Sequence, residues 1–331
     1  MSSYQFALID KHQAYLGVGL QRIVRSWSEL KQVRHYAIGY IDYDQNVYFG
    51  VFRGLKKVPL RQLIDATPFT LSRIHGEKFS SYQKKMKKLK YHLSIGDIYQ
   101  ANYCYRLSAR TNATPNQLLF HFVQKQPTPY AALINTPDVK IVSNSPELGV
   151  RIDHQTITCQ PMKGTRPKTA EKKELVESKK EQAELDMITD VVRNDLAQFA
   201  VPGSVKVKRR RQIVGFNTVW QAQSVIQAKR PKSIHTLEVM KALLPYASVT
   251  GAPKKRAVEI LQKLETYPRG VYCGAIGYIA GKNRAEFNVA IRTAVLKNNQ
   301  LHYSVGGGIT FDSDPKAEFQ ETLDKAAILQ L

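Results

Sequence analysis

Cysteine and long apolar runs are both scarce in this sequence. Its 331 residues include three cysteines, Cys104, Cys159 and Cys273, whose spacing is not that of a metal-binding motif. Few and odd in number, they favour a reducing compartment over a secreted, disulfide-rich fold. No apolar run approaches the ~20 residues of a membrane span, and the N-terminal segment lacks the pattern of a signal peptide. We therefore expect a cytoplasmic protein without a membrane-spanning helix.

Acidic residues are few relative to basic ones. The chain has 27 Asp and Glu against 49 Lys and Arg, a formal charge of +22. Such a field attracts nucleic acid, membrane surfaces and small anions. The basic residues are densest over 84–90 and 206–211, without zinc-finger spacing or an aromatic RNA-binding signature. We interpret both clusters as solvated faces and expect no nucleic-acid partner; a basic nucleic-acid-binding protein is the alternative from another functional class.

The pattern of strands and helices indicates the fold class. No repeat or low-complexity linker divides the chain. Strands and helices come in blocks rather than in strict alternation, which predicts an α+β fold instead of a doubly wound sheet. The expected strands are 35–43, 45–51, 131–134, 139–143, 148–152, 156–159, 271–279, 287–296 and 301–305, and the expected helices are 80–95, 168–199 (one or two helices), 237–244, 253–264 and 317–329.

The last three expected strands form a meander with two hairpin turns, GKNR at 281–284 and KNNQ at 297–300. Alternation along its middle strand places Arg292 between Ala290 and Ala294, on the face opposite the core. A guanidinium with such small neighbours has room to bind a carboxylate bidentately. A structural ion pair explains the pattern equally well.

Three further patterns suggest anion binding or a buried carboxylate. Glu184 lies beside an apolar helical stripe, where an unpaired carboxylate is costly, although a first-turn Glu also suits the helix dipole. Thr250 stands where it could cap the helix that has Pro253 in its first turn, and free N–H groups at such an end bind anions. The glycines at 306–308 end the third meander strand and permit the positive φ angles of an anion-binding nest. Each pattern also has an ordinary structural explanation.

Six segments share their order and residues with known motifs. They are PMKGTRP at 161–167, DVVRND at 190–195, SVTGAPKKRA at 248–257, RGVYCGAIGY at 269–278, FNVAIRTA at 287–294 and GGGITFDSDPKAEFQET at 306–322. Together they resemble the chorismate-utilising enzymes, from about Ile95 to the C-terminus. The resemblance implies an α+β fold with a two-sheet β-sandwich core, helices outside and the active site between the sheets. Residues 1–331 would form one domain, with 1–90 a shortened N-terminal part and 91–331 the catalytic core.

The resemblance also implies roles for individual residues. Glu184 and Glu321 would be the Mg2+ ligands, in keeping with the preference of that ion for hard oxygen donors; from spacing alone, Glu321 and Lys325 look like a surface ion pair. Glu147 matches the general acid that assists loss of the C4 hydroxyl. The expected substrate-binding residues are Thr250 and Gly251, with Lys325 nearby, for the ring carboxylate, and Tyr272, Arg292 and the Gly307 backbone for the enolpyruvyl carboxylate.

Two positions distinguish the reactions of this family. Members that activate water carry a lysine where this chain has Gln100, and members that make anthranilate carry an alanine where it has Lys163. By resemblance, Lys163 adds to C2 of chorismate as the C4 hydroxyl leaves, and ammonia then attacks C4 and expels the lysine. That role needs an unprotonated amine; the structural alternative is a turn lysine in water.

The expected product is thus 4-amino-4-deoxychorismate, which leads to 4-aminobenzoate and folate. Anthranilate is the alternative product, weakened by Gln221, which replaces a histidine that is linked to pyruvate elimination. None of the three cysteines lies in the G-x-C-x-G context of a glutaminase nucleophile. We therefore expect a separate glutamine amidotransferase subunit to supply ammonia.

Overall fold

The computed structural model describes residues 4–10, 12–216 and 219–331 of the chain. Every pairing between the described strands is antiparallel. The strands are β1 (Gln5–Asp10), β2 (Gln13–Val24), β3 (Tyr36–Ile41), β4 (Val47–Pro59), β5 (Gln100–Arg110), β6 (Tyr130–Asn135), β7 (Lys140–Ser145), β8 (Leu148–Asp153), β9 (Thr156–Gln160), β10 (Met162–Pro167), β11 (Lys206–Gly215), β12 (Val219–Lys229), β13 (Gly251–Ala252), β14 (Ala275–Ala280), β15 (Arg284–Val289), β16 (Thr293–Lys297) and β17 (Gln300–Ile309).

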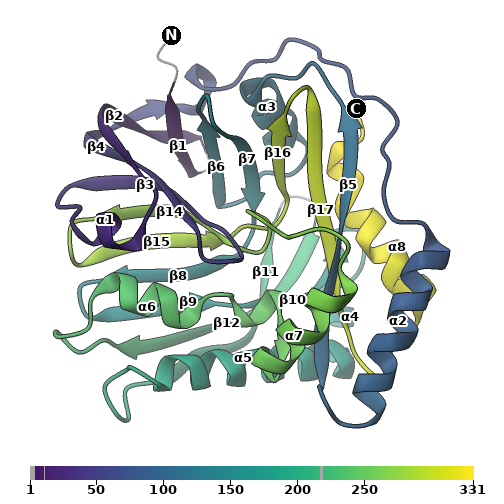
Figure 1. The fold of residues 1–331 in the computed structure, drawn as a ribbon. Helices are drawn as coiled ribbons and strands as arrows, with labels where there is room; N and C mark the ends of the chain where they lie inside the picture. The colour runs from purple at the N-terminus through teal and green to yellow at the C-terminus, as the bar shows by residue number, and fades with distance from the viewer. Residues whose placement is uncertain (1–3, 11, 217–218) are drawn as a thin grey trace.

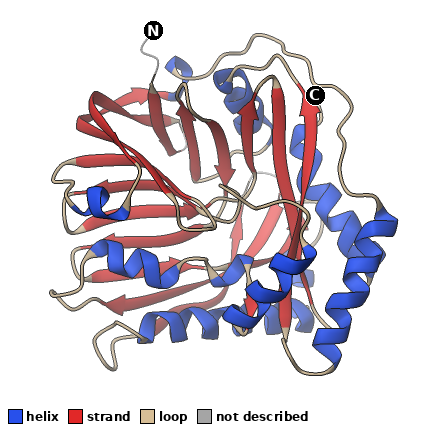
Figure 2. Cartoon of the chain, in the orientation of Figure 1, coloured by secondary structure: helices blue, strands red, loops and turns tan. Residues whose placement is uncertain are grey.

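Helices lie outside these strands (Figure 2). None of the described helices is both long and apolar enough to cross a membrane. The helices are α1 (Trp27–Lys31), α2 (Phe79–Ser94), α3 (Pro115–Lys125), α4 (Lys172–Glu177), α5 (Lys179–Ala197), α6 (Thr236–Leu243), α7 (Lys254–Leu264) and α8 (Pro315–Ala326), with 3-10 turns η1 (Leu60–Gln62), η2 (Ala247–Val249) and η3 (Ala327–Leu329).

The strands run in two directions. In Figure 1, β3, β14, β15, β8, β9 and β12 cross the view, whereas β6, β7, β16, β17 and β5 run along its height. Hydrogen bonding nevertheless continues from one group to the other, because β2 pairs with β1 and β1 with β6. The α+β class is confirmed, but the strands form one continuous network in place of two separately bonded sheets.

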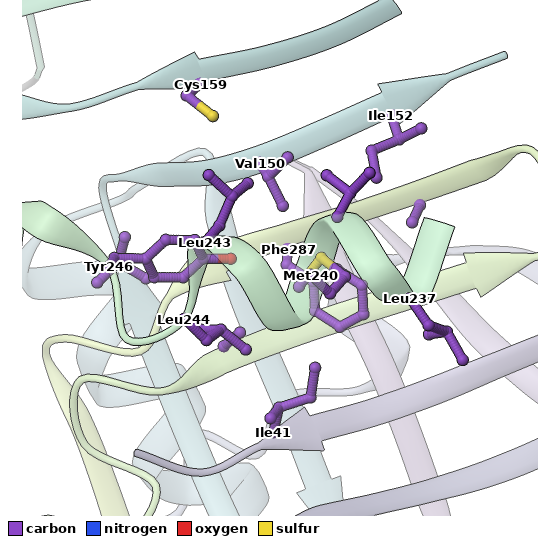
Figure 3. Packing of buried hydrophobic residues seen from close by; sticks show 14 of the residues in the cluster. Ile41, Val150, Ile152, Cys159, Leu237, Met240, Leu243, Leu244, Tyr246 and Phe287 are labelled. Carbon is purple, nitrogen blue, oxygen red and sulfur yellow. The ribbon is translucent and has the colours of Figure 1, made fainter. Parts of the chain in front are cut away.

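Each group of strands packs against its own helices. In the hydrophobic cluster beside the strands that include β8 and β15, Met240 of α6 lies among side chains that include Val150 and Phe287 (Figure 3). In the hydrophobic cluster beside the strands that include β5 and β17, Tyr82 of α2 and Tyr303 of β17 are among the largest fully buried side chains. The apolar positions of α2 recur at helical spacing, and most lysines of the 84–90 cluster face solvent. That cluster is therefore a largely solvated face, as expected.

The prediction of one strand over 287–296 is wrong, because the strand ends at Val289 and a new strand begins at Thr293. Arg292 has a φ of +50°, and its carbonyl accepts a hydrogen bond from the Asn144 amide at 3.0 Å. The break lets β15 pair with β8 and β14 while β16 pairs with β7 and β17. This crossing between the two groups of strands carries Ile291 and Arg292 out of the ladder. The hairpin at 297–300 is confirmed, with Asn298 and Asn299 in the left-handed region.

Three local expectations are also corrected. The glycines at 306–308 lie within β17, paired with β5, and have no positive φ. They permit close approach instead, since a Cβ at Gly306 would lie 2.6 Å from Cys104 Sγ. Thr250 does not cap α7, because Pro253 occupies the N-cap and the Thr250 hydroxyl donates to Tyr246 O at 3.0 Å. The strand predicted from Val271 begins at Ala275, after a turn.

Candidate active site

A cavity of about 780 Å³ opens among β10, β17, α5, α8 and the segment that connects β15 to β16. It brings together residues as far apart in the sequence as Asn102 and Ile328, and the fold places the glycine run of β17 near β10. Most of the predicted site residues line this cavity: Glu147, Lys163, Glu184, Tyr272, Arg292, Glu321 and Lys325.

Lys163 directs its amine into this cavity. It lies on β10 beside a register shift, and the next residue, Gly164, has a φ of +71°. A Cβ placed on Gly308 would lie 3.0 Å from Lys163 Nζ, so the amine faces the glycine run of β17. The side chain is half-buried. A lysine held against a buried strand is not the fully solvated turn lysine that was the structural alternative.

Glu147 lies in the short connection between β7 and β8 and is 4% exposed. Ser145 fixes this connection, since its hydroxyl accepts from Glu147 N at 3.2 Å and donates to Val289 O at 2.6 Å. Burial raises the pKa of Glu147 to about 7, although hydrogen bonding to Ser248 and the charge of Lys163 oppose the rise. A carboxyl group with this pKa holds a proton part of the time at neutral pH, as a general acid requires.

Glu184 on α5 and Glu321 on α8 face the cavity from two helices. Burial raises the pKa of Glu184, with Lys163 and Lys180 opposing it. Burial acts in the same direction on Glu321, but nearby cations outweigh it and hold the pKa of Glu321 below its ordinary range. The strongest of these is Lys325, whose Nζ lies 2.7 Å from Glu321 Oε1. Both carboxylates therefore lie in one electrostatic environment that is rich in cations.

Three further carboxylates, Glu181, Glu318 and Asp324, line the same cavity and were missed from the sequence. Glu318 is 5% exposed and accepts from Ser313 Oγ at 2.6 Å. Glu181 and Glu318 lie three residues before the predicted metal ligands Glu184 and Glu321, and Asp324 lies three residues after Glu321. Residues at i and i+3 share a helix face. That spacing is the signal that would have identified them.

Glu184 and Glu321 supply oxygen donors of the type that a hard divalent cation prefers. Among the described residues, no group of three or more His, Cys, Asp or Glu side chains has an arrangement that could hold a metal ion. Mg2+ commonly takes only one or two protein carboxylates and completes its shell with waters and substrate oxygens. Glu184 and Glu321 suit that pattern, because their cavity also leaves room for a substrate.

Arg292 lines the cavity from the break between β15 and β16. Its guanidinium forms no ion pair within the described part of the chain, so the structural ion pair considered from the sequence is not present. Burial lowers its pKa, with Tyr303 opposing. Since an uncompensated buried charge is costly, this arrangement favours an anionic ligand. Tyr272, buried at 8% exposure, lines the same cavity.

Three of the predicted substrate-binding residues do not line the cavity. Thr250 is fully buried, Gly251 pairs with Ala101 in β13, and Gly307 pairs with Tyr103 in β17. Their neighbours do reach it, namely Ser248, Val249, Gly306 and Gly308. The roles of all three stay predictions.

The two glutamines that bear on reaction choice also lie near Lys163. Gln100 is 1% exposed, and neither polar atom of its side chain has a hydrogen-bond partner among the described residues. Gln221 lines the cavity and donates from Nε2 to Thr165 Oγ1 at 3.1 Å. Neither side chain can act as an acid or base at neutral pH.

Known proteins resemble this chain over most of its length. The chorismate binding enzyme family matches residues 55–330. Aminodeoxychorismate synthase component 1 of Salmonella typhimurium is 35% identical over 268 residues, covering 78% of this chain and 59% of that protein. Anthranilate synthase component 1 of Pseudomonas aeruginosa is 36% identical over 251 residues, covering 74% of this chain and 51% of that protein. The chain thus spans only about half to three-fifths of the length of these relatives.

Solved structures share the fold. Anthranilate synthase component I from Streptococcus pneumoniae has a TM-score of 0.81 at 23% identity, covering 98% of this chain and 92% of that one. The menaquinone-specific isochorismate synthase from Escherichia coli has a TM-score of 0.83 at 17% identity, covering 99% and 89%. At these identities the likeness speaks to the fold alone. The match over residues 55–330, with relatives at 35% identity, shows that the chain belongs to the chorismate binding enzyme family.

Proposed function

We propose that this chain is an aminodeoxychorismate synthase component I, which converts chorismate and ammonia to 4-amino-4-deoxychorismate. The observation that carries the proposal is Lys163, whose amine faces the glycine run of β17 inside the cavity. Anthranilate-forming relatives, by the resemblance described above, have no amine at this position. A nucleophilic lysine beside a protonatable carboxyl group suits displacement of the C4 hydroxyl.

Chorismate is a dianion, and the cavity supplies cations for both carboxylates. Arg292 lies there without an ion pair among the described residues, and Lys325 donates to Gly306 O at 2.9 Å beside the glycine run. Glu184 and Glu321 would hold Mg2+, which would supply positive charge for a substrate carboxylate. This arrangement orients the ring between Lys163 and Glu147.

The proposed steps balance in atoms and protons. Glu147 gives its proton to the departing C4 hydroxyl, which leaves as water, while the Lys163 amine forms a bond to C2. Ammonia then attacks C4 and the bond from Lys163 to C2 breaks. The Glu147 carboxylate takes one proton from the new C4 ammonium group and is ready for the next turnover. The pKa of Glu147, about 7, suits both transfers.

A separate subunit supplies ammonia in this proposal. The relatives are named component 1 of their synthases, which implies a second component in those proteins. All three cysteines of this chain are buried, and burial raises the pKa of Cys104 and Cys159, opposite to what an activated thiolate requires. We propose a glutamine amidotransferase as the partner.

Anthranilate formation is the second candidate, because relatives of both kinds match at similar identity. Product analysis distinguishes the two. The chain is incubated with chorismate, Mg2+ and an ammonium salt, with and without an added aminodeoxychorismate lyase. We expect 4-aminobenzoate only when the lyase is present. Fluorescent anthranilate released without lyase would reject our proposal in favour of the second candidate.

A further inference from the structure

A second, much smaller cavity adjoins the active-site cavity. Its volume is about 20 Å³, enough for one molecule of the size of water. Glu147 and Ser248 line both cavities. The small cavity therefore lies directly behind the carboxyl group to which we assign the proton transfers.

One polar group in the wall of this small cavity lacks a partner. The Tyr246 hydroxyl is buried and has no hydrogen-bond partner among the described residues. Gly149 makes room for it, since a Cβ at that position would lie 2.6 Å from Tyr246 Oη. A buried hydroxyl without a protein partner is costly, so its position in the wall of this cavity indicates a small polar ligand.

The charges around the small cavity are balanced. Asp195 of α5 lines it and pairs with Lys254 at 2.5 Å, with both side chains largely buried. The other titratable groups in its wall are Glu147, Cys159 and Tyr246, and burial raises the pKa of each, which favours the neutral forms. A neutral ligand suits such a wall better than a cation does.

We propose that the small cavity binds one molecule of ammonia and holds it beside Glu147 for attack on C4. Ammonia has the size of water and offers three N–H donors, which the oxygens of Tyr246 and Asp195 can accept. This place beside Glu147 suits the reaction. Glu147 becomes a carboxylate when it gives its proton to the departing hydroxyl, and it can then accept a proton from the incoming nitrogen. This inference rests on the proposed function and identifies where its second substrate waits.

The test compares Tyr246→Phe with Tyr82→Phe. Tyr82 offers a matched control, since its buried hydroxyl also lacks a partner among the described residues but lies in α2, away from both cavities. Steady-state rates are measured at fixed pH while either the ammonium salt or chorismate is varied. We expect Tyr246→Phe to raise the KM for ammonium roughly tenfold, the loss of about one hydrogen bond.

The KM for chorismate should change less than twofold in Tyr246→Phe, and Tyr82→Phe should match the wild type in both constants. Thermal unfolding of both variants checks that each is folded. A Tyr246→Phe enzyme that is folded, active and unchanged in its KM for ammonium would overturn the ammonia site and leave water as the occupant. Wild-type protein that forms no amine product from chorismate and ammonium would instead reject the proposed function, and the ammonia site with it.

Discussion

Lys180 of α5 bridges to α8, with its Nζ 3.4 Å from Glu318 Oε1 and 3.9 Å from Glu184 Oε1. The bridge joins the two helices that carry most of the acidic residues of the cavity. It compensates like charges that would otherwise repel one another across the cavity wall. A bound divalent cation would compensate the same charges, so the lysine and the metal act on one electrostatic balance.

We therefore expect Lys180→Met to make folding more dependent on Mg2+. Without metal, the variant should unfold about 2–4 °C below the wild type, because the loss is on the order of 1 kcal/mol for a half-exposed lysine. Saturating Mg2+ should raise its unfolding temperature by more than it raises that of the wild type. Lys173→Met, which removes the exposed pair with Glu177, serves as the control. Equal Mg2+ shifts in the three proteins would contradict a metal site between these helices.

Lys163→Ala should abolish covalent capture of the substrate. We expect aminodeoxychorismate formation to fall by roughly 100-fold or more, since the variant lacks the amine to which we assign the attack on C2. Intact-protein mass spectrometry after rapid quenching with chorismate should show an adduct in the wild type only. Lys125→Ala, which removes another lysine that lines the cavity, should keep the adduct. The same adduct mass in Lys163→Ala would show that the nucleophile lies elsewhere.

Local periodicity predicted much of the fold but not the crossing between its two groups of strands. The helix at 80–95 and the hairpin at 297–300 were expected because their signals are local, a repeating apolar face and an Asn-Asn turn. The break at Arg292 has no such signal. The alternation of apolar residues continues through it, and only pairing with β7, distant in the sequence, ends one strand and begins another.

In the candidate site, too, local sequence signals predicted some features, whereas others depend on contacts between residues that are distant in the sequence. Spacing alone favoured a first-turn glutamate for Glu184 and a surface ion pair for Glu321, and only the resemblance brought them together. Lys180 was not expected, because a lysine one turn before a glutamate looks like any exposed helical pair. The small cavity beside Tyr246 depends on side chains from β8, α5 and the segment after α6. Such three-dimensional packing leaves no periodic trace in the sequence.

The buried carboxyl of Glu147 should make stability depend on pH. Burial raises its pKa from 4.5 to about 7, so the native state holds the proton more tightly than the unfolded state does. The resulting stabilisation is complete below pH 4.5 and is lost as pH rises through about 7. Glu147→Gln cannot ionise, and relative to wild type its free energy of unfolding should therefore rise by about 3 kcal/mol between pH 4.5 and pH 8. Urea unfolding at several pH values measures this difference, and a difference that is constant with pH would contradict the buried, proton-holding carboxyl.

A buried ion pair behind the cavity should support its wall. Arg269 Nη2 lies 2.7 Å from Glu265 Oε1, and both side chains are less than 10% exposed. The same guanidinium donates to Val249 O and Asn102 O, each at 2.7 Å, and both of those residues line the active-site cavity. Removing the arginine alone leaves a buried carboxylate without its cation and takes a donor away from two buried carbonyls.

We expect Arg269→Met to destabilise the protein by about 3–5 kcal/mol, and the double variant Arg269→Met/Glu265→Met to lose less than the two single losses added together, because it leaves no unpaired charge. Urea unfolding of the four proteins gives the coupling energy. The exposed pair of Arg193 and Asp190, treated in the same way, should show coupling below about 1 kcal/mol. Additive losses at Arg269 and Glu265 would mean that solvent reaches the pair. In that case the wall formed by Val249 and Asn102 would be held by backbone pairing alone, and the KM for chorismate should stay unchanged in Arg269→Met. If Arg269 does support the cavity wall, the same variant should raise the KM for chorismate.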